Sequence, residues 1–494
     1  MFSDFQLGLE VALSWNGLLM CAVGVTLGTF IGVLPGVGVL ATIAMLLPIT
    51  FGMEPAIGLI MLAGVFYGAA YGGSTAGILL NLPGTANTAV TCLDGFPLNQ
   101  QGRGAMALFV TAIASFVGSM FGALILAVLS HPLAEMARGF GPQEYFALLL
   151  LGIIAASSFS SVGLVRAIAM TFFGILIGLI GVDMNTGIER FTFGSQFLYD
   201  GMPLVALAIG LFGIPEVIKN LAEKNTPKIE QPHLSYKAML PKRQEWKRAV
   251  PAMGRGAGIG SILGVLPGAG SLIASFVSYA VERNLSKTPG KFGKGAIEGI
   301  SSPESANNAA IQTAFVPTLT LGVPGDSTMA IVLAALLVHG INPGPQFASQ
   351  HPDIFWGLIV SFLIGNFLLL IINIPLIGIW VRLLSIPYTI LFPCIVVFSC
   401  VGVYSVRYET IDVLFIAGFA ALGFAMRLFR LEATPLLLGF VLGPMLEEHF
   451  RRTLLLSRGD LGAFVSQPIS ITLYLVSAGM VFWVAKNALV KRFR

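Results

Sequence analysis

Charge is the scarcest property of this sequence. Only 11% of its 494 residues are charged, and 55% are hydrophobic. Soluble globular domains carry about 25% charged residues, so the composition excludes an ordinary soluble protein. Apolar runs near the roughly 20 residues needed to cross a bilayer recur at 104–130, 143–160, 164–182, 353–380, 410–426 and 467–485. We therefore predict an all-α integral membrane protein with about 10–12 transmembrane segments.

Residues and motifs that support catalysis are also few. The four cysteines lie in apolar stretches without metal-ligand spacing, and the five histidines are scattered. Residues 290–295 lack the phosphate-binding Gly-x-x-x-x-Gly-Lys-Ser/Thr pattern, and the Gly-x-Gly pairs follow apolar helices rather than strands. Neither a Ser/His/Asp constellation nor a His-Glu-x-x-His motif is found. We predict that the chain is not an enzyme and holds no tightly bound cofactor.

Basic residues are missing from the first 15 positions, which hold only Asp4 and Glu10 as charges. The basic region of a cleavable signal peptide is therefore absent, and we expect the first helix to remain as a membrane anchor. Positive charge gathers instead at 216–249, where eight bases face four acids. By the positive-inside rule this segment is a cytoplasmic linker, a better interpretation than a nucleic-acid site. The basic tail 491–494 favours a cytoplasmic C-terminus.

A glycine-rich motif occurs twice, and this repeat is the strongest positive signal. Gly-Val-Leu-Pro-Gly-Val-Gly at 32–38 returns as Gly-Val-Leu-Pro-Gly-Ala-Gly at 264–270, close to half a chain length later. Small residues spaced by four precede both copies and predict close helix packing in lipid. The repeated positions that we assign to this structural motif are Gly32, Pro35, Gly36 and Gly38 in the first copy, and Gly264, Pro267, Gly268 and Gly270 in the second.

The repeat divides the chain. We predict a first transmembrane repeat at 15–215, the basic linker at 216–249, a second repeat at 250–430, and C-terminal transmembrane segments with a basic tail at 431–494. The loop at 50–54 has no base, whereas its counterpart after the second motif carries Arg283, Lys287, Lys291 and Lys294. One side of a membrane should not hold both loops, so inverted repeats are favoured. Inverted repeats with broken helices are typical of secondary transporters, with the site at the repeat interface.

A second Pro-Gly break follows each motif, at 81–85 and at 322–327. The break of the second half lies further from its motif than the break of the first half does, and the extra residues fit the turn-rich basic loop at 284–294. Proline and glycine together end a helix within the membrane. The broken ends expose N–H groups that suit an anion and carbonyls that suit Na⁺.

Polar side chains cluster around these breaks, and we predict that they line the substrate and ion site. The candidate residues are Asn81, Pro83, Gly84, Thr85, Asn87, Asn307, Asn308, Gly322, Pro324, Gly325, Asp326 and Ser327. No base lies in the broken segments, so amide and hydroxyl donors would bind a carboxylate while co-transported cations lower the net charge. Asp326 and Asn308 are candidate Na⁺ ligands. Asp326 equally fits a helix N-cap, and Glu304 fits either a cation ligand or the cap of a helix beginning after Pro303.

The two glycine motifs, the stretch 67–74, the break Asn81-Leu82-Pro83-Gly84-Thr85 and the segment 303–309 together resemble the TctA family, the large membrane subunit of bacterial tripartite tricarboxylate transporters. The resemblance spans Trp15 to about Arg452. One departure is Ser305, which stands where the resemblance leads us to expect alanine.

The resemblance implies a binding-protein-dependent secondary importer in the bacterial inner membrane. It implies three partners: a small membrane subunit, a periplasmic solute-binding protein and the carboxylate substrate. It also implies an ion gradient, usually of Na⁺, as the driving force. Citrate, another tricarboxylate, a dicarboxylate and an aromatic acid all fit as substrates, and inverted repeats permit either an elevator or a rocking movement. The rival interpretations are a passive anion channel, a membrane scaffold and an intramembrane enzyme.

Overall fold

The computed structural model describes residues 2–34, 38–158, 160, 162–183, 186–222, 236–266, 270–384 and 388–492. The first half contains helices α1 (Phe2–Ala12), α2 (Trp15–Val33), α3 (Val39–Thr50), α4 (Pro55–Leu80), η1 (Ala86–Thr88), α5 (Ala89–Leu98), η2 (Asn99–Arg103), α6 (Gly104–Ala137), α7 (Pro142–Ser158), α8 (Leu164–Gly178), η3 (Gln196–Leu198), α9 (Leu204–Ala208), η4 (Ile209–Gly213) and α10 (Ile214–Ala222). The two-residue strands β1 (Gly181–Val182) and β2 (Glu189–Arg190) form an antiparallel hairpin after α8.

The second half has only helices as secondary-structure elements among its described residues, and turns and loops join these helices. It contains α11 (Tyr236–Met239), α12 (Arg243–Val265), α13 (Gly270–Leu285), η5 (Pro289–Lys291), α14 (Glu298–Thr313), α15 (Phe315–Leu321), α16 (Ser327–Val338), α17 (Phe347–Gln350), α18 (Pro352–Asn373), α19 (Ile377–Leu383), α20 (Tyr388–Arg407), α21 (Thr410–Leu428), α22 (Ala433–Leu456), η6 (Leu461–Val465) and α23 (Pro468–Arg492). The prediction of an all-α fold is confirmed.

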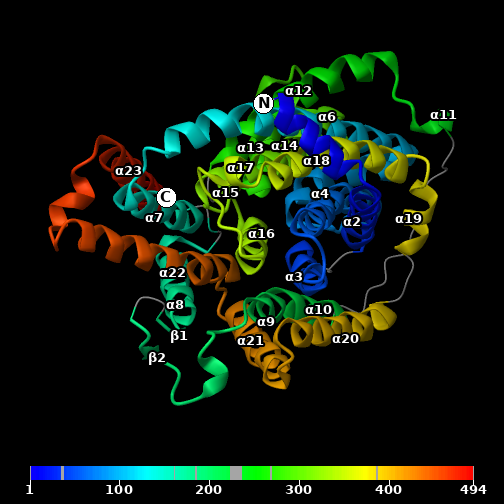
Figure 1. Ribbon diagram of the computed structural model, residues 1–494. Helices are drawn as coiled ribbons and strands as arrows, with labels where there is room; N and C mark the ends of the chain where they lie inside the picture. The colour runs from blue at the N-terminus through cyan, green and yellow to red at the C-terminus, as the bar shows by residue number, and fades with distance from the viewer. Residues whose placement is uncertain are drawn as a thin grey trace.

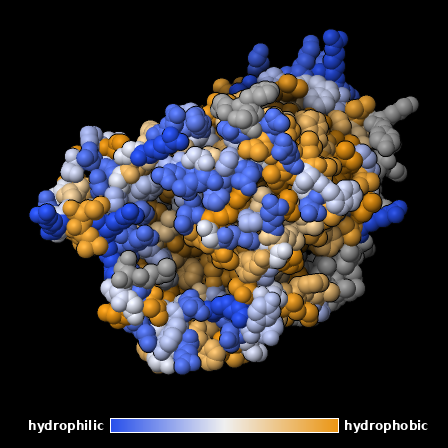
Figure 2. Space-filling view, viewed as in Figure 1, coloured by the Kyte–Doolittle hydropathy of each residue, from blue (hydrophilic) through white to orange (hydrophobic). Residues whose placement is uncertain are grey.

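In the part of the chain that the structure describes, five helical segments are long and apolar enough to cross a membrane. They are Trp15–Val33, Pro55–Leu80, Ala86–Ala137, Pro352–Asn373 and Thr410–Leu428, and seven shorter apolar helices accompany them. Apolar side chains also cover much of the face that Figure 2 shows, alongside polar ones. Phe367 and Ile371 of α18 are more than half exposed, as is Phe398 of α20. Such large apolar side chains are stable at the surface only when lipid or protein covers them, so the fold is that of an integral membrane protein.

The predicted helix packing occurs in both halves, between α2 and α4 and between α12 and α14 (Figure 1). A side chain at Gly24, Gly28 or Gly32 would collide with the α4 backbone at Met61, Val65 and Ala69 in turn. In the second half, Gly256, Gly260 and Gly264 face the α14 backbone at Ser302, Ala306 and Ala310 in the same manner. Close backbone contact through small residues is the usual way for helices to associate in lipid.

These contacts also relate the two halves position by position. The three α2 glycines that face α4 precede their α12 counterparts by the number of residues that separates Pro35 from Pro267. The α4 residues that these glycines face also precede their α14 counterparts by a constant number of residues. This number is slightly larger than the one for the glycines, because the second half has additional residues between α13 and α14, around the predicted basic loop. The centres of both glycine motifs, including Pro35, Gly36, Pro267 and Gly268, lie outside the described residues. Helices do end just before each centre, at Val33 and Val265.

The halves interlock through two long helices. Helix α6 of the first half packs on α14, where Gly118 and Gly122 face the backbone at Ser305 and Ala309. Helix α18 of the second half packs on α4, where Gly365 meets the Tyr67 ring. Tyr71 of α4 also donates to Asn366 Oδ1 of α18 over 3.2 Å. The polar stretch of α14 is therefore enclosed by elements from both halves.

The C-terminal helices α22 and α23 pack with α7 and α8 in a lobe at the left of Figure 1. Gly174 of α8 faces the backbone at Leu436, and Gly439 of α22 faces the backbone at Thr171. An ion-pair network ties the hairpin to α22: Arg190 and Arg451 each bind both Asp183 and Glu447. This lobe reaches the second Pro-Gly break, where α22 packs on α16 and Met445 neighbours Gly322.

Candidate functional site

The two Pro-Gly breaks have the same backbone design. Helix α4 ends at Asn81 and α15 ends at Gly322, both in the left-handed conformation, with φ of 57° and 69°. Asparagine and glycine are the residues that tolerate this conformation best. Further along each break, Thr85 and Asp326 are extended and begin the next helical segments. The interval between Asn81 and Gly322 equals that between Thr85 and Asp326, so both breaks are built as helix stops followed by new helix starts.

The two Pro-Gly breaks differ in how deeply their residues are buried. At the first break Asn81 and Pro83 are not buried, while Gly84 and Thr85 are. At the second break Gly322, Pro324 and Gly325 are buried, and Asp326 and Ser327 are partly buried. Both inner glycines meet a preceding helix: Gly84 lies against Gly32 and Gly73, and Gly325 lies against Ala314. The structure thus separates the more exposed tip Asn81–Pro83 from the inner part of the predicted site.

The inner part of the first break contacts the second half directly. The Asn87 amide of η1 donates to Ser271 Oγ of α13 over 2.9 Å and to Asn307 Oδ1 of α14 over 2.6 Å. The Asn307 Nδ2 group is buried and has no hydrogen-bond partner among the described residues. A buried donor without a partner is energetically costly. The cluster therefore offers an unused amide donor at the meeting point of the two halves.

Asp326 acts as an N-cap. Its Oδ1 accepts from the backbone N–H groups of Thr328 and Met329, both at 2.9 Å. A carboxylate is well suited to this position because the helix N-terminus carries partial positive charge. The same carboxylate neighbours Gly270, at the end of the second glycine motif. The cap that the sequence offered as one alternative is confirmed, and it occupies donors that an incoming anion would otherwise use.

Several polar atoms on α14 lack partners. Asn308 donates to the Glu304 carbonyl over 3.0 Å, but its Oδ1 has no partner among the described residues. Gln312, one turn further, has neither amide atom paired in that set. Both side chains are fully buried. Polar residues are expensive inside a bilayer and usually serve an ion or substrate pathway.

Glu304 does not cap a helix, so that expectation was wrong. Helix α14 begins at Glu298 and passes through Pro303, which lies in its interior. Packing of α14 against α12 and α6 holds the helix across the proline. Glu304 is wholly buried and accepts hydrogen bonds from Thr91 of α5 and from Ser115 of α6, the latter over 3.3 Å.

Asp94 of α5 is a buried residue that sequence reasoning missed. Its Oδ1 accepts from four consecutive backbone N–H groups, of Gly293, Lys294, Gly295 and Ala296, at 2.7–3.1 Å. Its Oδ2 accepts from the Tyr279 hydroxyl at 2.9 Å. Gly293 and Gly295 have φ of 81° and 100°, which lets the loop curl around the carboxylate. The extra residues of the second half therefore form a backbone nest that anchors α5.

We expect Asp94→Ala to destabilise the protein strongly. The substitution leaves four N–H groups of the nest unpaired, and each buried one costs about 1–3 kcal/mol. Asp94→Asn is the matched control because it keeps one acceptor oxygen for the nest, and it should unfold much closer to wild type. Thermal unfolding in detergent measures both. Equal unfolding temperatures for Asp94→Ala and wild type would contradict this role.

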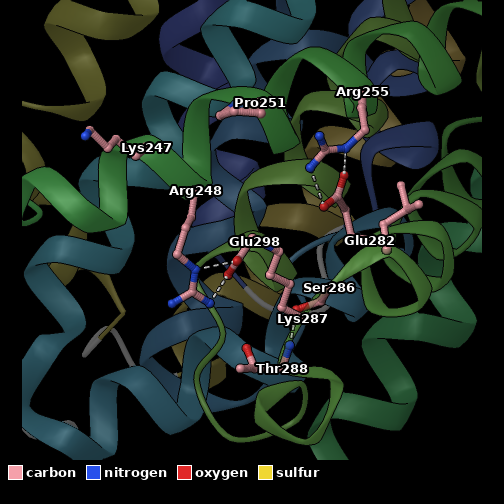
Figure 3. A pocket seen from close by; sticks show the side chains of 10 residues that line it. Lys247, Arg248, Pro251, Arg255, Glu282, Ser286, Lys287, Thr288 and Glu298 are labelled. Atoms are coloured by element: carbon pink, nitrogen blue, oxygen red, sulfur yellow. Dashed lines mark hydrogen bonds and ion pairs between the residues drawn. The ribbon is translucent and has the colours of Figure 1, made fainter.

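A basic cavity of about 360 Å³ lies beside α12, α13 and the start of α14 (Figure 3). Arg248 binds Glu298 through two bonds of 2.5 and 2.7 Å, and Arg255 binds Glu282 through two bonds of 2.5 and 2.9 Å. The two charges within each pair cancel, so the net positive charge of the cavity comes from Lys247 and Lys287. A cavity with net positive charge raises the local concentration of anions.

The sequence comparisons agree with these observations. The family model described as "Tripartite tricarboxylate transporter TctA family" matches residues 18–438. The chain belongs to the TctA family. The matched residues include both glycine motifs, both breaks and the whole polar cluster. Membership of the family makes the chain a component of a tripartite transport system.

Two relatives of this TctA protein come from Agrobacterium vitis. One, described as "Uncharacterized 52.8 kDa protein in TAR-I ttuC' 3'region", is 47% identical over 97% of this chain and 95% of its own length. The other, described as "Uncharacterized protein in TAR-II ttuC' 3'region", is 54% identical over 43% of this chain and 88% of its own length. No solved structure matches the chain significantly.

Proposed function

We propose that this TctA protein is the permease subunit of an ion-driven importer of tricarboxylates or related carboxylates. The observation that carries the proposal is the Asn87–Ser271–Asn307 cluster, where the first break meets α13 and α14. Its donors are uncharged, and the buried amide of Asn307 is unused. A carboxylate oxygen accepting from such a donor forms a charge-assisted hydrogen bond, which is stronger than a neutral one.

The difference between the two breaks supports separate binding sites for the carboxylate and for the cation. At the second break the Asp326 carboxylate already occupies the N–H groups of α16, so an anion would be repelled there and a cation attracted. The first break has no acid between Asn81 and Thr88. We therefore assign the carboxylate to the first break, with Asn87 and Asn307, and assign Na⁺ to the region of Asp326 and Asn308.

The remaining components follow from the proposal. A periplasmic solute-binding protein would deliver the carboxylate, a small membrane subunit would pair with this chain, and both membrane subunits would lie in the bacterial inner membrane. The contacts of α2 with α4 match those of α12 with α14 position by position, which supports a repeat. The positive charge of the linker and of the loop at 284–294 supports an inverted orientation of the second repeat.

Reconstitution tests the function. The chain and its small partner would be placed in proteoliposomes, with the binding protein and labelled citrate outside, with and without an inward Na⁺ gradient. We expect saturable uptake that requires both the gradient and the binding protein. Uptake that neither saturates nor responds to the gradient would instead identify a passive channel. If citrate is not taken up, a screen of the binding protein's ligands would supply the acid for the same assay.

Two Asp326 variants separate its capping role from cation binding. Asp326→Ala removes both functions and is expected to abolish uptake, with a capping cost of about 1 kcal/mol. Asp326→Ser restores a capping oxygen without the charge. If Asp326 holds Na⁺, the serine variant folds like wild type but transports poorly at any Na⁺ concentration. Wild-type uptake by Asp326→Ser would show that the residue is a cap alone.

A further inference from the structure

Glu304 is a fully enclosed carboxylate among the elements around the breaks. It is 0% exposed, and its two oxygens accept from hydroxyls on two other helices, Thr91 of α5 and Ser115 of α6. Helices α5 and α6 belong to the first half and α14 to the second. Any group bound at this carboxylate would therefore contact both halves, and any movement between them would change its surroundings.

No basic side chain balances Glu304 among the described residues. Helix α12 packs on α14, and its arginines Arg248 and Arg255 are bound to Glu298 and Glu282. Glu298 lies at the start of α14, roughly 9 Å from Glu304 along the helix. The titratable groups that face Glu304 are Tyr71 of α4 and Cys92 of α5, neither of which supplies positive charge. An uncompensated buried carboxylate is strongly unfavourable.

Oxygen atoms without partners among the described residues lie on the same face of α14 as Glu304 and on the facing helix α4. Asn308 and Gln312 follow Glu304 at intervals of four, so the three side chains share one face of α14. Asn308 Oδ1 and Gln312 Oε1 are buried and unpaired in the described part of the chain. Ser74 of α4 faces Glu304, and its buried hydroxyl makes no hydrogen bond of ordinary geometry within the same set of residues. Carboxylate, hydroxyl and amide oxygens are the ligands that hard cations prefer.

We propose that Glu304 is the centre of a binding site for a small alkali cation, held with hydroxyl and amide oxygens from α4, α5, α6 and α14. The cation supplies the positive charge that the protein lacks there. The described residues contain no cluster of three His, Cys, Asp or Glu side chains, which sets this site apart from a transition-metal centre. The inference rests on the proposed function in one respect: the bound cation would be the coupling ion.

Cation binding is tested without transport. Purified wild-type protein in detergent would be heated in NaCl, KCl and choline chloride at equal ionic strength. We expect Na⁺ to raise the unfolding temperature of wild type in a saturable manner, because a ligand that binds the folded state stabilises it. Glu304→Gln, which keeps the shape of the side chain, should show a clearly smaller Na⁺ response than wild type, because only Na⁺ bound near Asp326 could still stabilise it. Glu144→Gln is the matched control, since Glu144 is also buried but lies in α7 beside Gly141 and Ser470, and it should respond like wild type.

Transport then tests coupling. Glu304→Asp keeps the charge on a shorter side chain, so we expect it to transport with a half-maximal Na⁺ concentration raised several-fold. It also serves as the informative variant if Glu304→Gln does not fold. An identical Na⁺ response in wild type and Glu304→Gln, or no specific Na⁺ response in wild type, would overturn the site. A Na⁺-stabilised wild type that transports no carboxylate would leave the site standing and refute the proposed function instead.

Discussion

Gly260→Ala is expected to unfold at a markedly lower temperature than wild type, although alanine is the better helix former. The added Cβ would lie 2.7 Å from the carbonyl carbon of Ala306 and even nearer its oxygen. Backbone atoms cannot rotate away as a side chain can, so α12 and α14 must separate. Overpacking of this kind costs about 1–3 kcal/mol, and here it also shifts α14, the helix that carries Asn307.

Gly258 provides a control on the same helix. No atom lies within 4 Å of the position that its Cβ would occupy. Helix propensity alone favours Gly258→Ala by about 1 kcal/mol. The control should therefore be as stable as wild type or more so. Thermal unfolding in detergent compares the pair, and equal stability of the two variants would contradict the close packing of α12 on α14.

Asn307→Ala should remove most carboxylate uptake while leaving the protein folded. The substitution deletes the acceptor for Asn87 and the unused amide donor. A hydrogen bond to a charged group is worth about 1.5–3 kcal/mol, which corresponds to roughly a 10- to 100-fold loss of apparent affinity. Uptake measured against carboxylate concentration in proteoliposomes gives this loss directly.

Asn373→Ala is the corresponding control. Asn373 is a buried asparagine of α18, and its amide donates to the Leu369 carbonyl of its own helix over 3.0 Å. We expect nearly wild-type uptake from this variant. If Asn307→Ala transports as well as Asn373→Ala, the amide cluster is not the carboxylate site.

The architecture followed from the sequence because each signal was local. Apolar runs predicted the membrane helices, and glycines at intervals of four predicted close helix packing. The structure shows which partners are packed, α4 against α2 and α14 against α12. Pro83 and Pro324 predicted where helices break. The left-handed caps at Asn81 and Gly322 are consistent with that prediction, since both residues tolerate positive φ.

The missed features depend on contacts between distant segments. Nothing near Asp94 in the sequence indicates that a loop in the second half of the chain folds around it. Pro83 is exposed and Pro324 is buried because other residues cover the tip of the second break and leave the tip of the first break open. Pro303 suggested a helix start, but packing of α14 extends the helix back to Glu298. Tertiary contacts decided each of these points.

The central claim is that the carboxylate binds where the first break meets α14. It is tested most directly by alkylation of a cysteine at Ala86, an exposed position beside Asn87, in a chain without its four native cysteines. We predict that saturating carboxylate slows labelling of Ala86→Cys and leaves labelling of Gln346→Cys, on a separate exposed turn before α17, unchanged. Equal labelling rates with and without a carboxylate that the reconstituted system transports would contradict the account.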